Sequence, residues 1–286
     1  MTIKGLVSHT ALAVALLVAA AGMAAADDQL IVHRIKTGTG PVLDPDAGLW
    51  KTVPEQAVAL QAQMIATPVN AEPAVSALTV RAVHDGLWIT FQLRWDDPTK
   101  SDIVNLDQFG DQVAIELPVK PYDANNPPNP MMGDAEQPVT IMQWRAVLQH
   151  DQEVGNPQLS DIYPNAKIDF YYDQLLKPEE AIAYTGAVGL GNPVSRVGKS
   201  PVLDQMAAGF GSLTIKPTQR AGAKGKWADG HWTVVIARPL KSDGDYDPKL
   251  APGDASVAAF AVWDGGKDET GSRKAWSDWI ALTLEK

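Results

Sequence analysis

The clearest structural signal in the sequence is residues 87–95, which read Leu-Trp-Ile-Thr-Phe-Gln-Leu-Arg-Trp. Every second residue of this run, from Leu87 to Trp95, is bulky and apolar, which is the pattern of a β-strand with one face toward a core. The turn sequence Asp85-Gly86 comes directly before it, and another apolar run covers residues 78–83. Two such runs on either side of an Asp-Gly turn predict an antiparallel hairpin.

Strand-like runs of the same kind recur along the chain. One of them follows another Asp-Gly turn, at residues 229–230. Short strands separated by turn signals predict an all-β fold, mainly an antiparallel β-sandwich, with long loops and a few short helices. The further strands expected are residues 112–117, 231–238, 256–263 and 279–284.

Two long segments interrupt this pattern. Residues 118–140 contain six prolines, and residues 151–224 are rich in Gly, Pro and Asn. Within the second segment, Lys177-Pro178 and Ser200-Pro201 are pairs at which a short helix could begin. Loops this long inside a compact domain usually carry function.

The first 26 residues have the features of a signal peptide. Lys4 provides the positive start, residues 11–21 form a short apolar run, and Ala24-Ala25-Ala26 is a small-residue cleavage pattern. The run is too short to span a bilayer, and no later window is long and apolar enough. We therefore expect residues 1–26 to be cleaved and residues 27–286 to be exported to the periplasm as one soluble domain.

Composition excludes several classes of protein. The 286 residues include no cysteine, which excludes disulfides, thiolate zinc sites, resident iron–sulfur clusters and covalent c-type haem. A formal net charge of −10 argues against a nucleic-acid partner. Hydrolase and nucleotide-binding motifs are missing, and the histidines lack metal-ligand spacing. Four aspartates could bind Ca²⁺, but Asp-Pro turns explain them equally well: Asp44, Asp46, Asp96 and Asp97.

Two segments of the long loops could hold a cofactor. Met131 and Met132 precede Gly133 in a polar loop stiffened by proline, where an ordinary core stripe is not expected. A thioether is a soft ligand that suits iron or Cu(I), although packing or a hydrophobic lid would also explain the pair. The glycines on either side of Phe210 would allow the backbone to approach a flat ligand closely.

Four motifs in a fixed order give the sequence a family resemblance. They are Trp-Ile-Thr-Phe-Gln-Leu-Arg-Trp-Asp-Asp-Pro at residues 88–98, the methionine loop with residues 138–144, the segment from Lys199 to residue 214, and residues 229–240. Together they resemble the haem b-binding gamma subunits of the ethylbenzene dehydrogenase, dimethylsulfide dehydrogenase, selenate reductase and chlorate reductase group. The resemblance covers residues 30–284 and implies a β-sandwich like a carbohydrate-binding module.

The resemblance implies one non-covalent haem b with Met and Lys as axial ligands. Met132 is the first choice for the methionine, with Met131 as its rival and Met142 as a wall of the pocket. Lys199 is the first choice for the lysine, with Lys241 as runner-up and Lys216 and Lys224 as weaker candidates. Phe210 would contact the haem. The arginines that could pair with its propionates are Arg145, Arg196 and Arg238.

The resemblance also implies partners and a role. The chain would relay electrons without catalysing a reaction, since a six-coordinate iron leaves no position for substrate. Its partners would be a molybdenum catalytic alpha subunit, an iron–sulfur beta subunit and a soluble c-type cytochrome. Two alternatives remain open from the residues alone. The nine Trp could form the sugar platform of a carbohydrate-binding module, and the methionines could belong to a copper-handling protein or an enzyme.

Overall fold

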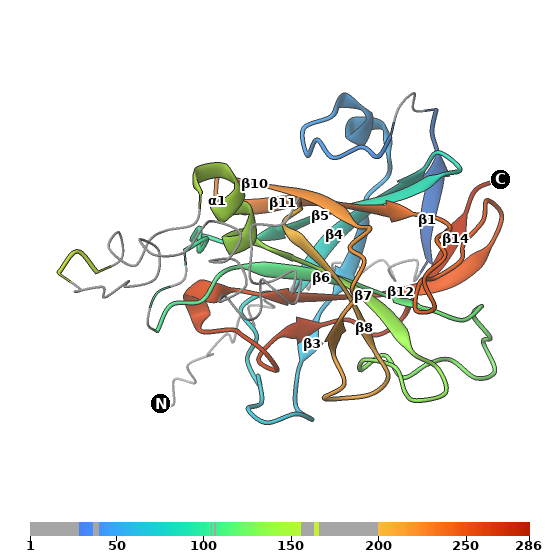
Figure 1. Ribbon diagram of the computed structural model, residues 1–286. Helices are drawn as coiled ribbons and strands as arrows, with labels where there is room; N and C mark the ends of the chain where they lie inside the picture. Colours follow the sequence, from blue (N-terminus) through green and yellow to red (C-terminus); the bar gives the residue numbers. More distant parts are fainter. Residues whose placement is uncertain (1–28, 37–39, 104, 106, 156–162, 166–199) are drawn as a thin grey trace, which may run out of the picture.

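The predicted hairpin is confirmed. The computed structural model describes residues 29–36, 40–103, 105, 107–155, 163–165 and 200–286. In it, strand β4 (Ala77–His84) runs antiparallel to β5 (Trp88–Asp96) (Figure 1). Thr79 lies opposite Arg94, and His84 lies opposite Ile89. The alternation of β5 therefore places its apolar residues on the face that meets the core.

The other predicted strands are also present. They are β6 (Gln112–Pro118), β11 (His231–Pro239), β12 (Ala255–Trp263) and β14 (Ile280–Leu284). The remaining elements are β1 (Gln29–Arg34), η1 (Gly48–Thr52), β2 (Gln56–Ala59), β3 (Gln61–Ala62), β7 (Val139–Arg145), α1 (Ala146–Val154), β8 (Val202–Ala207), β9 (Thr214–Ile215), β10 (Gly222–Ala228), η3 (Gly265–Lys267) and β13 (Ala275–Trp276).

The strands form one curled sheet whose two halves stack on each other. Its hydrogen-bonded order is β10-β11-β5-β4-β1-β14-β12-β6-β7-β8-β9. Figure 1 shows one layer with β10, β11, β5 and β4, and a second with β6, β7, β8 and β12. Strand β12 turns the corner between the halves, because residues 255–258 pair with β14 and residues 259–263 pair with β6. The all-β sandwich class is confirmed, and its two layers are parts of a single sheet.

Two pairings differ from the antiparallel expectation. Strand β1 runs parallel to both β14 and β4, with Leu30 opposite Leu282 and Val32 opposite Ala82. A turn signal in the sequence predicts only a hairpin, in which the two strands are antiparallel. Parallel strands are joined by long connections, which have no such local signal. The parallel position of β1 therefore had no local signal in the sequence.

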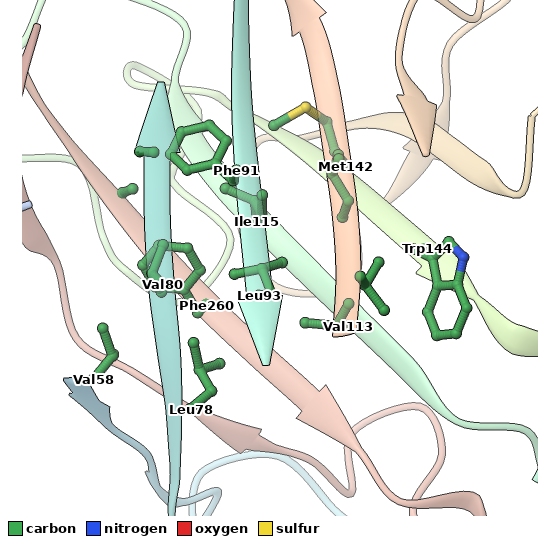
Figure 2. Close-up of a cluster of buried hydrophobic side chains, with 14 of the residues drawn as sticks. Val58, Leu78, Val80, Phe91, Leu93, Val113, Ile115, Met142, Trp144 and Phe260 are labelled. Carbon is green, nitrogen blue, oxygen red and sulfur yellow. The ribbon is translucent and has the colours of Figure 1, made fainter. Parts of the chain in front are cut away.

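The main core lies between the two layers. Figure 2 shows Val80 and Phe91 of the hairpin facing Ile115 of β6 and Phe260 of β12. At one end of this core three buried indoles pack together: the ring centroids of Trp144 and Trp232 are 4.9 Å apart, and Trp95 lies 6.4 Å from each. Aromatic contacts at these distances add stability beyond the area that they bury.

Several elements show no clear hydrophobic periodicity in the sequence. Strand β7 is buried along nearly its whole length, so its residues do not alternate between apolar and polar types. The pair Ser200-Pro201 precedes strand β8 instead of a helix, and Lys177-Pro178 lies outside the described residues, as does the expected signal peptide. Among the described residues, no helix has the length and apolar character that a membrane span requires.

Candidate cofactor site

Alternate residues of three neighbouring strands point away from the core and form the floor of a cavity. Strands β6, β7 and β12 direct Ile115, Met142 and Phe260 inward. The residues between these, such as Ala114 and Ile141, point to the opposite face of the layer. Both belong to a second hydrophobic cluster, whose buried members are Ala114, Val139, Ile141, Ala207, Ala261 and Trp263. The cavity above this face has a volume of about 420 Å³, which is within the usual range for a small-molecule site. Its floor is Gln112, Ala114, Glu116, Ile141, Gln143, Arg145, Ala259, Ala261 and Trp263.

Three loop segments form the walls of this cavity. They contribute Pro130 to Met132; Phe210, Gly211 and Leu213; and residues between Thr270 and Ser277, while Gln63 and Ala66 of a fourth segment complete the wall. The first two loops are joined, because the backbone N–H of Gly209 donates to the carbonyl of Met132 over 2.9 Å. The methionine loop and the Phe210 segment, 77 residues apart from Met132 to Gly209, are therefore brought together at one site.

Met132 adopts an unusual backbone conformation at this wall. Its φ is +72°, a left-handed value that disfavours residues other than glycine. The following Gly133 also has a positive φ, and a Cβ there would lie 2.6 Å from the carbonyl oxygen of Gln137. The turn aims the Met132 side chain at the second hydrophobic cluster, against which it packs. Strain of this kind at a cavity wall is typical of residues held in place for function.

Lys274 and Glu116 lie close together in the cavity, and neither was among the predicted site residues. Burial lowers the pKa of the Lys274 amine, while the charge of Glu116 acts in the opposite direction. Burial raises the pKa of Glu116 to about 8, against the charge of Lys274 and the backbone N–H of Met132. The Nζ of Lys274 lies 5.5 Å from the ring centroid of Trp263. Burial thus makes the Lys274 amine easier to deprotonate than a solvated lysine, and the deprotonated amine is the form of lysine that can bind a metal.

Polar atoms without partners also face this region. Arg145 donates from Nη2 to the Gln143 side chain over 3.0 Å, but its buried Nε has no hydrogen-bond partner. One carboxylate oxygen of Glu116 is likewise buried without a partner. Buried polar groups are nearly always satisfied in folded proteins, so a group that remains open in a cavity indicates a bound partner. The arginine offers a positive donor for an acidic group of a ligand.

Four of the predicted cofactor residues line this cavity: Met131, Met132, Arg145 and Phe210. Met142 does not, and the expectation that it forms a wall of the pocket is corrected here. It follows Ile141 in β7, so it points to the opposite face and lies fully buried in the main core (Figure 2). Lys199 and Arg196 lie outside the described residues.

The other predicted cations lie away from the cavity. Lys216 is buried and forms ion pairs with Asp204 at 2.9 Å and Asp247 at 2.7 Å, so its charge is already balanced. Arg238 is buried beside the same Asp247. Lys224 and Lys241 are exposed. None of these four lines the cavity.

The sequence held one weak signal for Lys274. It stands one residue before Ala275 and two before Trp276, in a short stretch that leads into the predicted last strand. A lysine beside an apolar pair is common on protein surfaces, so the pattern alone does not separate a cavity residue from a solvated one. Strand β13 decides its position, because Ala275 and Trp276 pair with β12 on one side and β3 on the other.

Fold and site together define a β-sandwich module with a largely apolar cavity on the outer face of one layer. The chain belongs to the ethylbenzene dehydrogenase family, whose profile matches residues 47–275. It is 26% identical to the chlorate reductase subunit gamma of Ideonella dechloratans, over 90% of this chain and 85% of that protein. It is also 26% identical to the dimethylsulfide dehydrogenase subunit gamma of Rhodovulum sulfidophilum, over 83% of this chain and 73% of that protein.

Further similarities are more distant. A respiratory nitrate reductase haem subunit of Haloferax mediterranei is 24% identical over 82% of this chain, which spans 66% of that protein. Among solved structures, a carbohydrate-binding protein of Bacteroides uniformis ATCC 8492 gives a TM-score of 0.44 at 10% identity, covering 90% of this chain and 99% of that one. A family 9 carbohydrate-binding module of Caldicellulosiruptor kristjanssonii gives 0.38 at 10% identity, covering 90% and 95%.

Proposed function

We propose that this chain is a haem b-binding electron-transfer subunit, and that Met132 and Lys274 are the axial ligands of the haem. The observation that carries the proposal is the cavity on the outer face of β6, β7 and β12, which both residues line. The names of the relatives support it, since one is a haem subunit and two are gamma subunits of oxidoreductases.

The donor set of the cavity fits a haem. Its floor and walls are largely apolar, with small residues such as Ala114 and Ala261 that leave room for a flat ring. A thioether and a neutral amine are both ligands that iron accepts. Arg145, with its open Nε, would receive a propionate.

Lys274, Met132 and Phe210 would each have a separate role in holding the haem. Burial lowers the pKa of the Lys274 amine and so favours its deprotonation on binding iron, and the left-handed turn at Met132 holds the thioether at the wall. Phe210, which is 66% exposed at the edge of the cavity, would reduce the access of water. When bound, the haem would supply reversible one-electron chemistry without a free position for substrate.

The role that follows is an electron relay. The chain would pass electrons between the iron–sulfur beta subunit of a molybdenum oxidoreductase and a soluble c-type cytochrome, and the molybdenum alpha subunit would carry out catalysis. We propose a periplasmic location after cleavage of residues 1–26, and a single haem-binding domain over residues 27–286. Met131 remains the alternative methionine, because it lines the same cavity, and Lys199 remains the alternative lysine.

Expression of the full chain with ample haem tests the proposal. We expect one haem per chain, a low-spin b-type spectrum, and release of all pigment into acidified organic solvent because the chain has no cysteine to bind haem covalently. The variant Ala261→Trp, which would fill the floor of the cavity, should lose most of the pigment. A matched Ala208→Trp change, in the loop after β8, should retain it. A folded, colourless protein that binds a glycan would contradict the proposal.

A further inference from the structure

A second cluster of chemical groups lies outside the cofactor cavity. The carboxylates of Asp97, Asp111 and Asp264 each offer one oxygen, and these oxygens all lie within 4.8 Å of one another. The three side chains come from the end of β5, the start of β6 and the end of β12, and all are buried. Of the four aspartates that the sequence marked as possible Ca²⁺ ligands, only Asp97 is part of this cluster.

We propose that Asp97, Asp111 and Asp264 form a binding site for one divalent cation, with Ca²⁺ as the ion that fits best. Two oxygens bound to one Ca²⁺ at about 2.4 Å are at most about 4.8 Å apart, and the three carboxylates meet this condition. The spacing of three carboxylates would not by itself distinguish a site from a chance cluster, and two further observations do so.

The first observation is that two of the carboxylates have open oxygens. Asp97 and Asp264 are 0% and 2% exposed, yet Oδ2 of Asp97 and Oδ1 of Asp264 have no hydrogen-bond partner. Among the described residues, no Lys, Arg or His forms an ion pair with any of the three aspartates. Lys267 is near enough for its charge to act on Asp264 but forms no ion pair with it. Several buried carboxylates without an ion-pair partner are unfavourable unless they gain protons or a cation.

The second observation is that neutral oxygens gather at the same place. A Cβ on Gly266 would lie 2.6 Å from Oγ1 of Thr99, 3.2 Å from Oδ1 of Asp264 and 3.3 Å from Oγ of Ser101. These hydroxyls would raise the number of oxygen ligands toward the six to eight that Ca²⁺ accepts. Thr99 and Gly266 are exposed, so the cluster lies just below the surface, where an ion can enter.

The donor types select among metals. All candidate ligands are oxygens, and oxygen ligands favour Ca²⁺, Mg²⁺ or Mn²⁺ over zinc and copper. Mg²⁺ holds its water shell tightly and is seldom bound by protein cages, whereas Ca²⁺ accepts a buried, irregular set of oxygens.

The position of the site indicates what the ion would stabilise. The Asp111 side chain already accepts from the backbone N–H of Ser101 at 2.7 Å and of Gly265 at 2.9 Å, and so links two loop segments. Trp263, directly before Asp264, lines the cofactor cavity. A cation here would join the β5–β6 connection to the end of β12 and fix one part of the floor of that cavity.

Calcium titration of the full chain after treatment with a chelator tests this site. Calorimetry should show one Ca²⁺ per chain, and Mg²⁺ should bind at least about tenfold more weakly. The melting temperature should rise with the Ca²⁺ concentration, as expected for a ligand of the folded state. Asp97→Asn and Asp264→Asn should each lose this rise. The matched control is Asp96→Asn, whose side chain is 91% exposed and paired with His231, and it should keep the rise.

Other results would overturn the proposal. A wild-type chain whose melting temperature is the same in Ca²⁺ and in chelator contains no such site, and this holds even if the variants fail to fold. Equal Ca²⁺ binding by the wild type and both Asn variants would place the ion elsewhere. An Asp97→Asn variant that melts above the wild type in all buffers would show that the carboxylates share protons instead. None of these readouts depends on haem, so they are independent of the proposed function.

Discussion

Met132 holds a conformation that its own side chain disfavours. A left-handed φ costs a residue with a Cβ about 1–2 kcal/mol, and here it is maintained by the Gly209–Met132 hydrogen bond and by the tight turn at Gly133. Met131 has no such positive φ, although it lines the same cavity. The strain therefore distinguishes the two methionines and supports Met132 as the ligand.

This conformation predicts an inverted order of stability among variants. In the haem-free chain, Met132→Gly should be more stable than Met132→Ala by about 1 kcal/mol, because glycine adopts a positive φ without strain. At Met131 the order should be the usual one, with the alanine variant more stable than the glycine variant. Urea unfolding of the four variants measures both differences. Equal stabilities for Met132→Ala and Met132→Gly would mean that the turn is not strained.

Some residues of the candidate site could be predicted from the sequence alone, and others could not. Met131, Met132 and Phe210 stood out because the few residues around each have an unusual composition. Such local features are visible in a sequence. Lys274 and Glu116 were not visible, because each acquires its role only when β6, β12 and β13 are placed side by side. The same reason explains why Asp97 was noticed without Asp111 and Asp264.

At the scale of elements, helix α1 is held to β10 through a single glutamine. Gln149 accepts from the backbone N–H of Gly225 at 2.6 Å, donates to the Gly225 carbonyl at 2.7 Å, and accepts from Nε1 of Trp144. A Cβ on Gly225 would lie 2.3 Å from the Trp144 indole, which is fixed between two other indoles. Only glycine therefore allows β10 to approach this cluster.

We expect Gly225→Ala to destabilise the chain by about 1–3 kcal/mol, the usual cost of overpacking a core. The matched control is Gly48→Ala, since a Cβ on Gly48 meets no atom within 4 Å; its effect should be within about 0.5 kcal/mol. Denaturant unfolding followed by tryptophan fluorescence measures both. Equal stabilities for the two variants would contradict the close packing described here.

The predictability of the fold differs from strand to strand. Residues 88–96 and 231–239 follow Asp-Gly turns and have bulky apolar side chains at alternate positions, so both strands were foreseeable. The pairing of residues 88–96 with residues 78–83 was foreseeable as well. Strands β7 and β8 are buried along nearly their whole length, and Val139, Ile141 and Ala207 belong to the second hydrophobic cluster on the outer face. Their missing alternation follows from burial of both faces.

At the scale of the whole molecule, a buried charge cluster joins the two layers. Asp247 contacts Lys216, which pairs with Asp204 of β8, and Arg238 of β11 in the other layer. Burial alone would raise the pKa of Asp247, but hydrogen bonds from Lys216 and Ser242 and the nearby positive charges hold it well below the usual range. The cluster therefore stabilises the folded chain only while Asp247 is ionised.

This cluster predicts a dependence of stability on pH. Because the folded pKa of Asp247 is lowered, its contribution is complete above the unfolded value of about 3.9 and is lost as the pH falls through the folded pKa. At pH 7, Asp247→Asn should cost about 3–5 kcal/mol, and the gap to the wild type should narrow below about pH 4. Asp46→Asn, in the exposed pair with Lys226, should change the stability little at any pH. Thermal unfolding across this pH range measures both variants, and a gap for Asp247→Asn that does not change with pH would contradict this account.

The assignment of the lysine ligand is the central claim about the site, and a comparison of variant spectra tests it most directly. The optical spectrum of the haem-loaded full chain should lose its low-spin form in Lys274→Ala, because the cavity then lacks the amine that would bind the iron. The spectrum should be unchanged in Lys241→Ala, whose side chain is exposed away from the cavity. An unchanged low-spin spectrum in Lys274→Ala, together with its loss in Lys199→Ala, would contradict the account.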